Sequence, residues 1–149
     1  MSGKTNPKHP KTPLFDASSI VNMAAFGGGK VVDVVTEVDA SVLPLTYYEV
    51  GNAIWKMHHL IKKLDREEAI SLLEVSMKLL DRLKIIECSR DDSSEIVNLA
   101  LDQNLTFYDA SYLFVATKHQ LSLITDDGKL SKIATNLKIE NRSSAAIIG

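Results

Sequence analysis

The stretch that decides the fold reads TFYDASYLFVA over residues 106–116 and LSLITDDGKL over residues 121–130. Apolar or small side chains occupy nearly every face of residues 110–116, which predicts a buried helix. The second segment predicts a short apolar strand that ends in two acids, Asp126 and Asp127. Asp109 stands at the start of the helix, so acidic side chains flank both elements.

Two interpretations of these acids compete. In the first, Asp109 caps the helix by accepting N–H groups of its first turn, and Asp127-Gly128 is an ordinary turn. In the second, the acids lie at the carboxyl edge of a parallel sheet, where open α/β folds build their sites, and share a metal ion. The rest of the chain decides between the two.

Length and composition indicate one globular domain. The chain has 149 residues, of which 45% are apolar and 24% are charged. A chain of this length can bury a hydrophobic core without disulfides or structural metals. No apolar run approaches the roughly 20 residues of a membrane span, so we expect a soluble protein with no membrane partner. Residues 1–12 carry lysines and prolines and precede no signal-peptide core, which predicts a flexible basic arm before a single domain over residues 13–149.

Charge and cysteine content bear on partners and compartment. The net charge of −2 supplies no overall positive field, so an RNA partner requires local Lys or Arg patches or a bound metal. The single cysteine, Cys88, cannot form an intrachain disulfide, and its apolar segment predicts a packed side chain rather than a nucleophile. We therefore expect a cytoplasmic protein.

Hydrophobic patterning alternates strands with helices along the chain. This order predicts an α/β fold whose mainly parallel sheet is covered by helices on both faces. The apolar face of the helix that follows Asp65 fits either the core or a subunit interface. Strands are expected at residues 13–15, 41–45, 85–86 and 121–124, with an added edge strand in the tail 143–149. Helices are expected at 17–26, 46–60, 66–83, 96–104, 106–116 and 131–134, and the apolar positions of 31–38 fit a helix or a strand, of which we favour the helix.

Glu49 has both a structural and a functional interpretation. Thr46 and Glu49 match a capping box, in which Glu49 reaches back to the start of its own helix. Asn52 follows three residues later, so a helix places Glu49 and Asn52 on one face. That pair equally suits a metal site.

Four acids recur where a strand ends or a helix begins: Asp16, Glu49, Asp109 and Asp127. Capping explains each of them singly, but a parallel sheet would gather them along one edge. Two carboxylates about 4 Å apart repel by roughly 4 kcal/mol at an effective dielectric of 20, so protons or a cation must offset the repulsion. A hard divalent ion such as Mg²⁺ or Mn²⁺ suits a shell of carboxylates and water, whereas the histidines show no zinc-ligand spacing with Cys88.

Four segments of the chain resemble the motifs of a nuclease family. They read LFDAS at residues 14–18, EVGNA at 49–53, YDASY at 108–112 and TDDGKL at 125–130. In order and spacing, across residues 13–140, they resemble the PIN-domain nucleases, particularly the stand-alone VapC-like toxins. The resemblance implies a PIN-like three-layer α/β/α fold and a Mg²⁺- or Mn²⁺-dependent endoribonuclease, often a homodimer, that acts as the toxin of a toxin–antitoxin pair.

The resemblance also implies roles for individual residues. Thr125 matches the threonine of the family's T-x-D motif, and Asp126 falls at the variable position within that motif. Ser18 and Asn52 match polar positions that orient ligands or water. The catalytic and metal-binding residues would be Asp16, Glu49, Asp109 and Asp127, and the supporting residues Ser18, Asn52, Thr125 and Asp126.

Lysines near the Glu49 helix are candidates for the RNA backbone, although exposed lysines are usually only solvated. These candidates are Lys56, Lys62 and Lys63.

Other functions remain open at this point. A haloacid-dehalogenase phosphatase needs a second Asp two residues after the first, where Ser18 stands, and a receiver domain needs its acid pair after the first strand. A housekeeping RNA-processing nuclease, or a PIN-like module that binds RNA or protein without catalysis, fits the same acids. Metal-dependent turnover separates the enzymes from the binding module.

Overall fold

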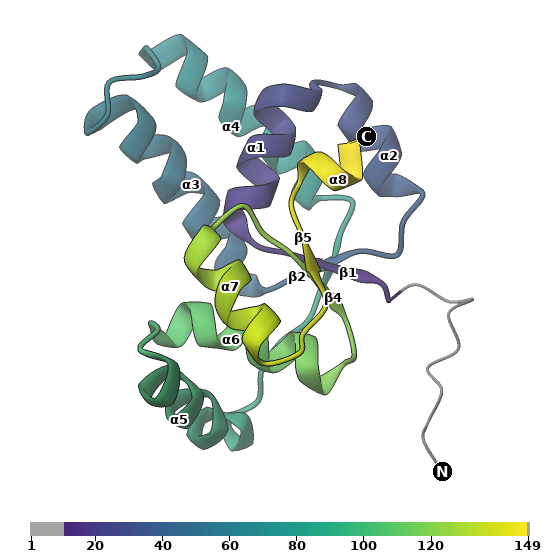
Figure 1. Ribbon diagram of the computed structural model, residues 1–149. Coiled ribbons are helices and arrows are strands. Elements are labelled where there is room, and N and C mark those ends of the chain that lie inside the picture. The colour runs from purple at the N-terminus through teal and green to yellow at the C-terminus, as the bar shows by residue number, and fades with distance from the viewer. Residues whose placement is uncertain (1–10, 149) are drawn as a thin grey trace.

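The computed structural model describes residues 11–148, in which helices and strands alternate along the chain (Figure 1). The predicted basic arm, residues 1–12, lies for the most part outside the described residues. No helix in the described part is long and apolar enough to cross a membrane. In chain order the elements are β1 (Pro13–Phe15), α1 (Ala17–Gly27), α2 (Lys30–Thr36), β2 (Ser41–Val42), α3 (Pro44–His59), α4 (Arg66–Leu80), β3 (Lys84–Ile85), the 3₁₀ helix η1 (Arg90–Asp92), α5 (Ser93–Gln103), α6 (Phe107–Lys118), β4 (Ser122–Ile124), α7 (Gly128–Asn136), β5 (Asn141–Arg142) and α8 (Ala145–Ile148).

The strands form one sheet in the order β3-β2-β1-β4-β5, and every neighbouring pair is parallel. Leu14 at the middle of β1 lies opposite Ser41 of β2 on one side and Leu123 of β4 on the other. The predicted α/β class and parallel sheet are confirmed.

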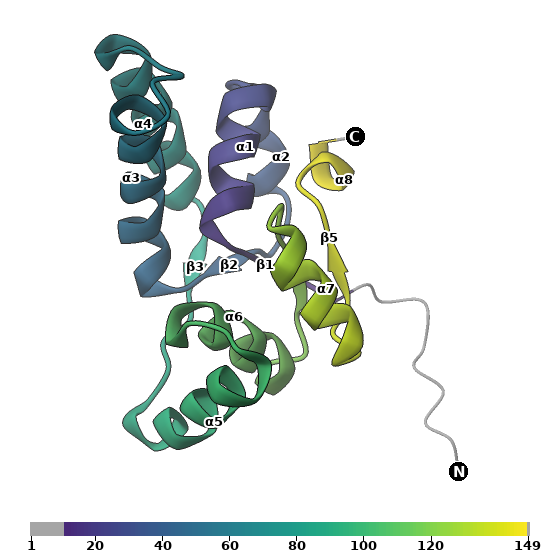
Figure 2. The same ribbon diagram turned by 60° about the vertical axis from the view of Figure 1, so that its left-hand side comes forward.

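Helices cover both faces of this sheet, because successive residues of a strand point to opposite sides. Leu14 and Leu123 pack with residues of α6 and α7, whereas Phe15 and Ile124 pack with residues of α1 to α4. Figure 2 shows α1 to α4 on one side of the sheet and α5 and α6 on the other. The three-layer α/β/α arrangement and the buried helix over residues 110–116 are thereby confirmed.

Several predicted boundaries differ from the structure: the helix expected at 66–83 ends at Leu80, and those expected at 96–104 and 131–134 begin at Ser93 and Gly128. The helix α3 begins at Pro44, not at Thr46, because proline at a first helical position lacks an N–H that would go unpaired there. The strand β2 therefore ends at Val42. In the tail, residues 145–148 form a helix, and the edge strand β5 lies just before the predicted segment, at Asn141–Arg142.

The apolar face of α4 belongs mostly to the core. Leu79 is fully buried, and Leu72, Leu73 and Met77 pack against the same core cluster, whereas Ile70 is half exposed. Core packing thus accounts for most of the leucine-rich pattern.

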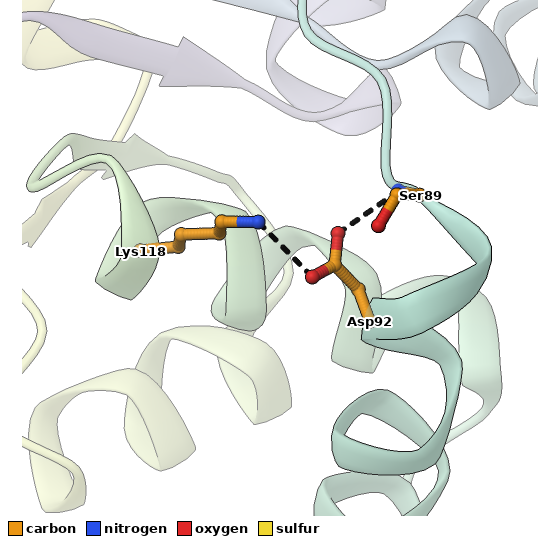
Figure 3. A network of polar contacts seen from close by, with 3 residues as sticks. All are labelled: Ser89, Asp92 and Lys118. Carbon is orange, nitrogen blue, oxygen red and sulfur yellow. Dashed lines mark hydrogen bonds and ion pairs between the residues drawn. The ribbon is translucent and has the colours of Figure 1, made fainter.

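Asp92 joins two parts of the helical layer that holds α5 and α6 (Figure 3). Its carboxylate accepts a 2.9 Å hydrogen bond from the Ser89 N–H and forms an ion pair with the Lys118 ammonium group at 3.0 Å. Asp92 stands at the N-cap position of α5, but its side chain makes no capping hydrogen bond there. Nearby, Cys88 is exposed rather than packed, which corrects the expectation for it; partial burial of its sulfur and the Asp92 charge raise the pKa of its thiol.

The strand β1 lies at the centre of the sheet, and the chain first adds strands on one side of it and then on the other. The strands β2 and β3 lie on one side of it, and β4 and β5 lie on the other. Open α/β sheets bind ligands outside the carboxyl ends of the strands at such a switch point. Asp16 follows β1 and Thr125 follows β4, so both lie at this point.

Candidate functional site

A cavity of about 240 Å³ lies at the switch point and gathers the acids that the sequence singled out. Each acid comes from a different part of the fold: Asp16 follows β1, Glu49 lies on α3, Asp109 lies in the first turn of α6, and Asp127 caps α7. The cavity is lined by Asp16, Ala17, Ser18, Glu49, Asn52, Ala53, Lys56, Asp109, Tyr112 and Asp127.

Asp16 is the most constrained of these acids. Its side chain is 5% exposed. One carboxylate oxygen accepts hydrogen bonds from the Ser18 hydroxyl at 2.8 Å and the Ser19 N–H at 2.9 Å, and the other accepts from the Thr125 hydroxyl. The capping interpretation of Asp16 is thus correct, and the cap also holds the carboxylate at the cavity wall.

Two hydroxyl groups join the loop after β1 to the loop after β4. Ser18 donates to Asp16 and accepts from the Asp126 N–H at 3.0 Å. Thr125 donates to Asp16 and accepts from the Asp127 N–H at 3.1 Å. The supporting positions assigned to Ser18 and Thr125 therefore fix the two loops against each other.

Asp127 begins α7 and keeps part of its carboxylate for the cavity. Its Oδ1 accepts from the N–H groups of Lys129 and Leu130, at 2.9 and 3.1 Å. Among the described residues, no hydrogen bond engages its Oδ2. Capping and ligand binding are thus compatible in this one side chain.

Glu49 does not close the predicted capping box, because α3 begins before Thr46. The Thr46 hydroxyl itself accepts from the Leu43 N–H at 3.1 Å, so Glu49 lies one turn into the helix. Its Oε1 instead accepts a 2.8 Å hydrogen bond from the hydroxyl of Tyr112, on α6. Asn52 lines the same cavity, as the helical spacing predicted.

Asp109 likewise does not cap its helix. Thr106 is the N-cap of α6, and its hydroxyl accepts the Asp109 N–H at 3.1 Å. The carboxylate of Asp109 makes no hydrogen bond to any described residue, although it lines the cavity. Of the two interpretations of Asp109, the structure excludes the cap.

Burial and mutual repulsion disfavour negative charge on these carboxylates. Burial, more than any other cause, raises the pKa of Asp16, Glu49 and Asp109. The charges of Asp109 and Asp16 further raise the pKa of Glu49, and those of Asp127 and Asp16 raise the pKa of Asp109. Within residues 11–148, neither ion pair involves any of the four acids. The site therefore has a deficit of positive charge.

Asp126 faces away from the cavity. Its two carboxylate oxygens accept from the Ser144 N–H at 2.9 Å and from the Asn22 amide at 2.8 Å. It thereby ties the tail to α1, and it does not line the cavity.

Of the three predicted RNA-binding lysines, Lys56 lines the acid cavity. Lys62 and Lys63 lie on the turn after α3, whose last residue, His59, is about 15 Å along the helix axis from Glu49. Their contact with RNA stays a prediction.

Sequence patterns missed the residues that hold Glu49 and Asp126. Tyr112 is 1% exposed and occupies the middle of a helix that we interpreted only as apolar. A signal was present, since a buried tyrosine normally needs a partner for its hydroxyl group. Ser144 offered no such signal, because it contributes only its backbone N–H.

The donor chemistry of the cavity suits a hard divalent cation. Carboxylates from four elements supply oxygen atoms, and at least Asp109 and Oδ2 of Asp127 keep lone pairs for a ligand. In the described part of the chain, no three acidic, histidine or cysteine side chains converge closely enough to hold one ion together. Mg²⁺ usually binds through one or two carboxylates and keeps several waters, so the spacing fits an ion held partly through water.

Comparisons with known families and proteins agree with this arrangement. The family model described as PIN domain matches residues 14–136. Exonuclease VapC9 of Pyrobaculum aerophilum is 38% identical over 121 residues, which cover 81% of this chain and 84% of the relative. Ribonuclease VapC3 of the same organism is 35% identical over 91 residues, which cover 60% of this chain and 67% of that relative.

Solved structures share the fold. The crystal structure of PAE2754 from Pyrobaculum aerophilum has a TM-score of 0.71 at 29% identity, and the match covers 94% of this chain and 96% of that one. A toxin–antitoxin complex from Klebsiella pneumoniae has a TM-score of 0.50 at 23% identity, covering 78% of this chain and 87% of that one. The second likeness bears on the fold alone.

Proposed function

This chain belongs to the PIN domain family, and from that premise we propose that it is a divalent-metal-dependent endoribonuclease, the toxin of a VapBC-type toxin–antitoxin pair. Membership of the family replaces the phosphatase and receiver interpretations. The observation that carries the proposal is the convergence of Asp16, Glu49, Asp109 and Asp127 on one cavity at the switch point of the sheet.

The same acids are proposed to hold Mg²⁺ or Mn²⁺. A divalent ion at this place would supply a bound water of lowered pKa and positive charge beside the phosphate oxygens. The raised pKa values of Asp16, Glu49 and Asp109 support the proposal, because a cation would restore the charged form of these carboxylates.

The side chains around the acids would position the carboxylates and the substrate. Ser18, Ser19 and Thr125 hold the Asp16 carboxylate through three hydrogen bonds, so its oxygens keep one orientation. Asn52 presents an amide to the cavity, which can orient a water or a substrate oxygen. Lys56 would neutralise charge on the substrate phosphate at the rim, and Lys62 and Lys63 would contact the RNA backbone further along.

The proposed partners follow from the resemblance to VapC-like toxins. They are an RNA substrate, a cognate antitoxin and a second copy of the chain in a homodimer. The proposed location is the cytoplasm, where a toxin of this kind meets its RNA. The relatives named Exonuclease VapC9 and Ribonuclease VapC3 support the proposed RNA substrate.

The first test is cleavage of a mixed pool of single-stranded and structured RNA, in Mg²⁺, in Mn²⁺ and in EDTA. We expect metal-dependent cleavage that Asp109→Asn abolishes without loss of fold, because the Asp109 carboxylate makes no hydrogen bond to a described residue and its backbone N–H, which Thr106 accepts, is unchanged. Retained cleavage in that variant would overturn the site. Metal binding without any cleavage would favour the non-catalytic module.

Exonuclease action is the second candidate, because the relative VapC9 is named an exonuclease. A covalently closed circular RNA separates the two modes. An endonuclease linearises the circle, whereas an exonuclease degrades only the linear form of the same sequence. We expect the circle to be cut.

A further inference from the structure

A second hollow adjoins the acid cavity. It has a volume of about 400 Å³ and is lined by Leu45, Tyr48, Glu49, Asn52 and Tyr108. Glu49 and Asn52 also line the acid cavity, so the two hollows share a wall. The two hollows are therefore adjacent.

Two tyrosines form the aromatic part of this hollow, and each directly precedes a site acid. Tyr48 precedes Glu49 on α3, and Tyr108 precedes Asp109 on α6. Their side chains are 75% and 59% exposed, although both rings are large and largely apolar. Exposed aromatic rings grouped beside a polar site indicate a contact surface.

The ring of Tyr48 has support from its neighbour. Tyr47 packs edge-on against it, with ring centroids 5.3 Å apart and ring planes at 87°. This contact restricts Tyr48 even though the ring itself is open to solvent. A ring that is exposed and also held in place suits stacking with a flat partner.

The chemistry of the hollow matches an RNA base. Proteins bind unpaired bases by stacking them on aromatic side chains and by hydrogen bonds to the base edges. Tyr48 and Tyr108 offer the faces, and the Asn52 amide offers a donor and an acceptor. A phosphodiester over the acids would leave the base of an adjoining nucleotide beside this hollow.

We propose that this hollow, termed the tyrosine pocket (Leu45, Tyr48, Asn52 and Tyr108), binds an unpaired nucleobase next to the phosphodiester that is cleaved. The proposal rests on the proposed ribonuclease function and deepens it, because it names the residues of this chain that would hold the base. A duplex keeps its bases stacked inside the helix and cannot place one in the pocket.

A binding experiment tests the pocket without requiring turnover. The probe is a single-stranded RNA octamer that carries 2-aminopurine, compared with the same strand annealed to its complement, with the protein in the Asp109→Asn background. We expect fluorescence quenching with the single strand only. Tyr48→Leu and Tyr108→Leu should each weaken binding about 5- to 100-fold and remove the quenching, whereas Tyr48→Phe and Tyr108→Phe keep both.

A matched control is Phe26→Leu. Phe26 is 78% exposed but lies near the end of α1, away from the Asp16 end of that helix. Its removal should leave binding and quenching unchanged. Melting temperatures of all variants would show that loss of binding is not loss of fold.

Three results would overturn the pocket. They are wild-type binding in the leucine variants, equal quenching with the duplex, and a change of oligomeric state in the leucine variants, which sedimentation would detect and which would make the surface an interface between copies. Absence of RNA cleavage by the wild-type chain would instead contradict the proposed function, and the quenching would still test the pocket.

Discussion

The hydroxyl group of Tyr112 donates a 2.8 Å hydrogen bond to Oε1 of Glu49, across 63 positions of sequence. Tyr112 has one hydroxyl proton, and the Glu49 carboxylate accepts it. The Thr46 hydroxyl therefore donates to the Tyr112 oxygen at 2.7 Å, while its own oxygen accepts the Leu43 N–H. The first turn of α3 thereby orients a carboxylate that lies on the same helix.

Replacement of Tyr112 by Phe should therefore affect the site more than the fold. Loss of a residue that orients a metal ligand typically costs about 10- to 100-fold in metal affinity or activity, and loss of one neutral hydrogen bond costs about 1 kcal/mol of stability. The hydrogen bond from Tyr112 also lowers the pKa of Glu49, so its removal should move the acidic limb of the activity profile to higher pH. Calorimetric Mn²⁺ titration and kcat/KM against pH measure both effects.

The control for this variant is Tyr108→Phe on the same helix, whose Mn²⁺ affinity is measured in the same titration. Tyr108 is exposed and its hydroxyl makes no hydrogen bond to a described residue, so Mn²⁺ binding should match the wild type. Equal Mn²⁺ affinity in Tyr112→Phe and the wild type would contradict the positioning role.

Asp126 and Asp127 are neighbours, and we expect opposite consequences when each is replaced by Asn. Asparagine caps helices as well as aspartate does, so Asp127→Asn should keep stability within about 0.5 kcal/mol while it weakens metal binding and cleavage. Asp126→Asn keeps one acceptor oxygen for two donors, so its NH₂ group faces either the Ser144 N–H or the Asn22 amide. The lost hydrogen bond should cost about 1–3 kcal/mol of stability, with metal affinity retained. Urea unfolding and Mn²⁺ titration of both variants distinguish the two acids; a metal defect in Asp126→Asn would contradict this assignment.

Local patterns predicted the sheet and the strand-end acids because those features depend on neighbouring residues. Leu14 and Phe15 alternate between the two core layers, and Asp16 follows directly, so the strand and its functional end could be inferred from one segment. The true cap of α6 was also present in the local pattern, since Thr106 stands three residues before Asp109, as in a capping box.

Contacts between distant segments could not be predicted in this way. The start of α3 depended on a choice between Pro44 and Thr46, and choosing Thr46 gave Glu49 a capping role it does not have. The partner of Glu49 comes from α6, and the partner of Asp126 is a backbone N–H. Neither pairing has a sequence period that would reveal it.

Lys56 should contact a phosphate of the bound RNA, and salt should weaken this contact by screening the charges. Each contact with single-stranded nucleic acid adds about −0.7 to the slope of log K against log salt concentration, so Lys56→Ala should reduce the slope by about that amount. Lys118 is the control, because it lies at the far end of α6 from Asp109 and pairs with Asp92. RNA binding measured between low and moderate salt should show an unchanged slope for Lys118→Ala; an unchanged slope for Lys56→Ala would remove this lysine from the RNA path.

The raised pKa of Asp109 links metal, pH and stability. Burial and the charges of Asp127 and Asp16 raise the pKa of Asp109 above its ordinary value of 3.8. Protonated Asp109 therefore contributes its full stability below pH 3.8, and this contribution is lost as pH rises through the raised pKa. Asp109→Asn cannot ionise, so without metal it should be more stable than the wild type at pH 7, and the difference should shrink as pH falls towards 3.8. Asp109 is only half-buried, so solvent screens part of the repulsion and the rise in Tm should be small.

Saturating Mg²⁺ should reverse this order. At 100 times its Kd, a ligand that binds only the folded state adds about 2.7 kcal/mol to the wild type, whereas Asp109→Asn, with a weakened site, gains less. Thermal melts at several pH values, in EDTA and in Mg²⁺, separate this account from a purely structural role. If Asp109 served only the fold, Asp109→Asn would be the less stable protein in EDTA at every pH, and Mg²⁺ would raise both Tm values equally.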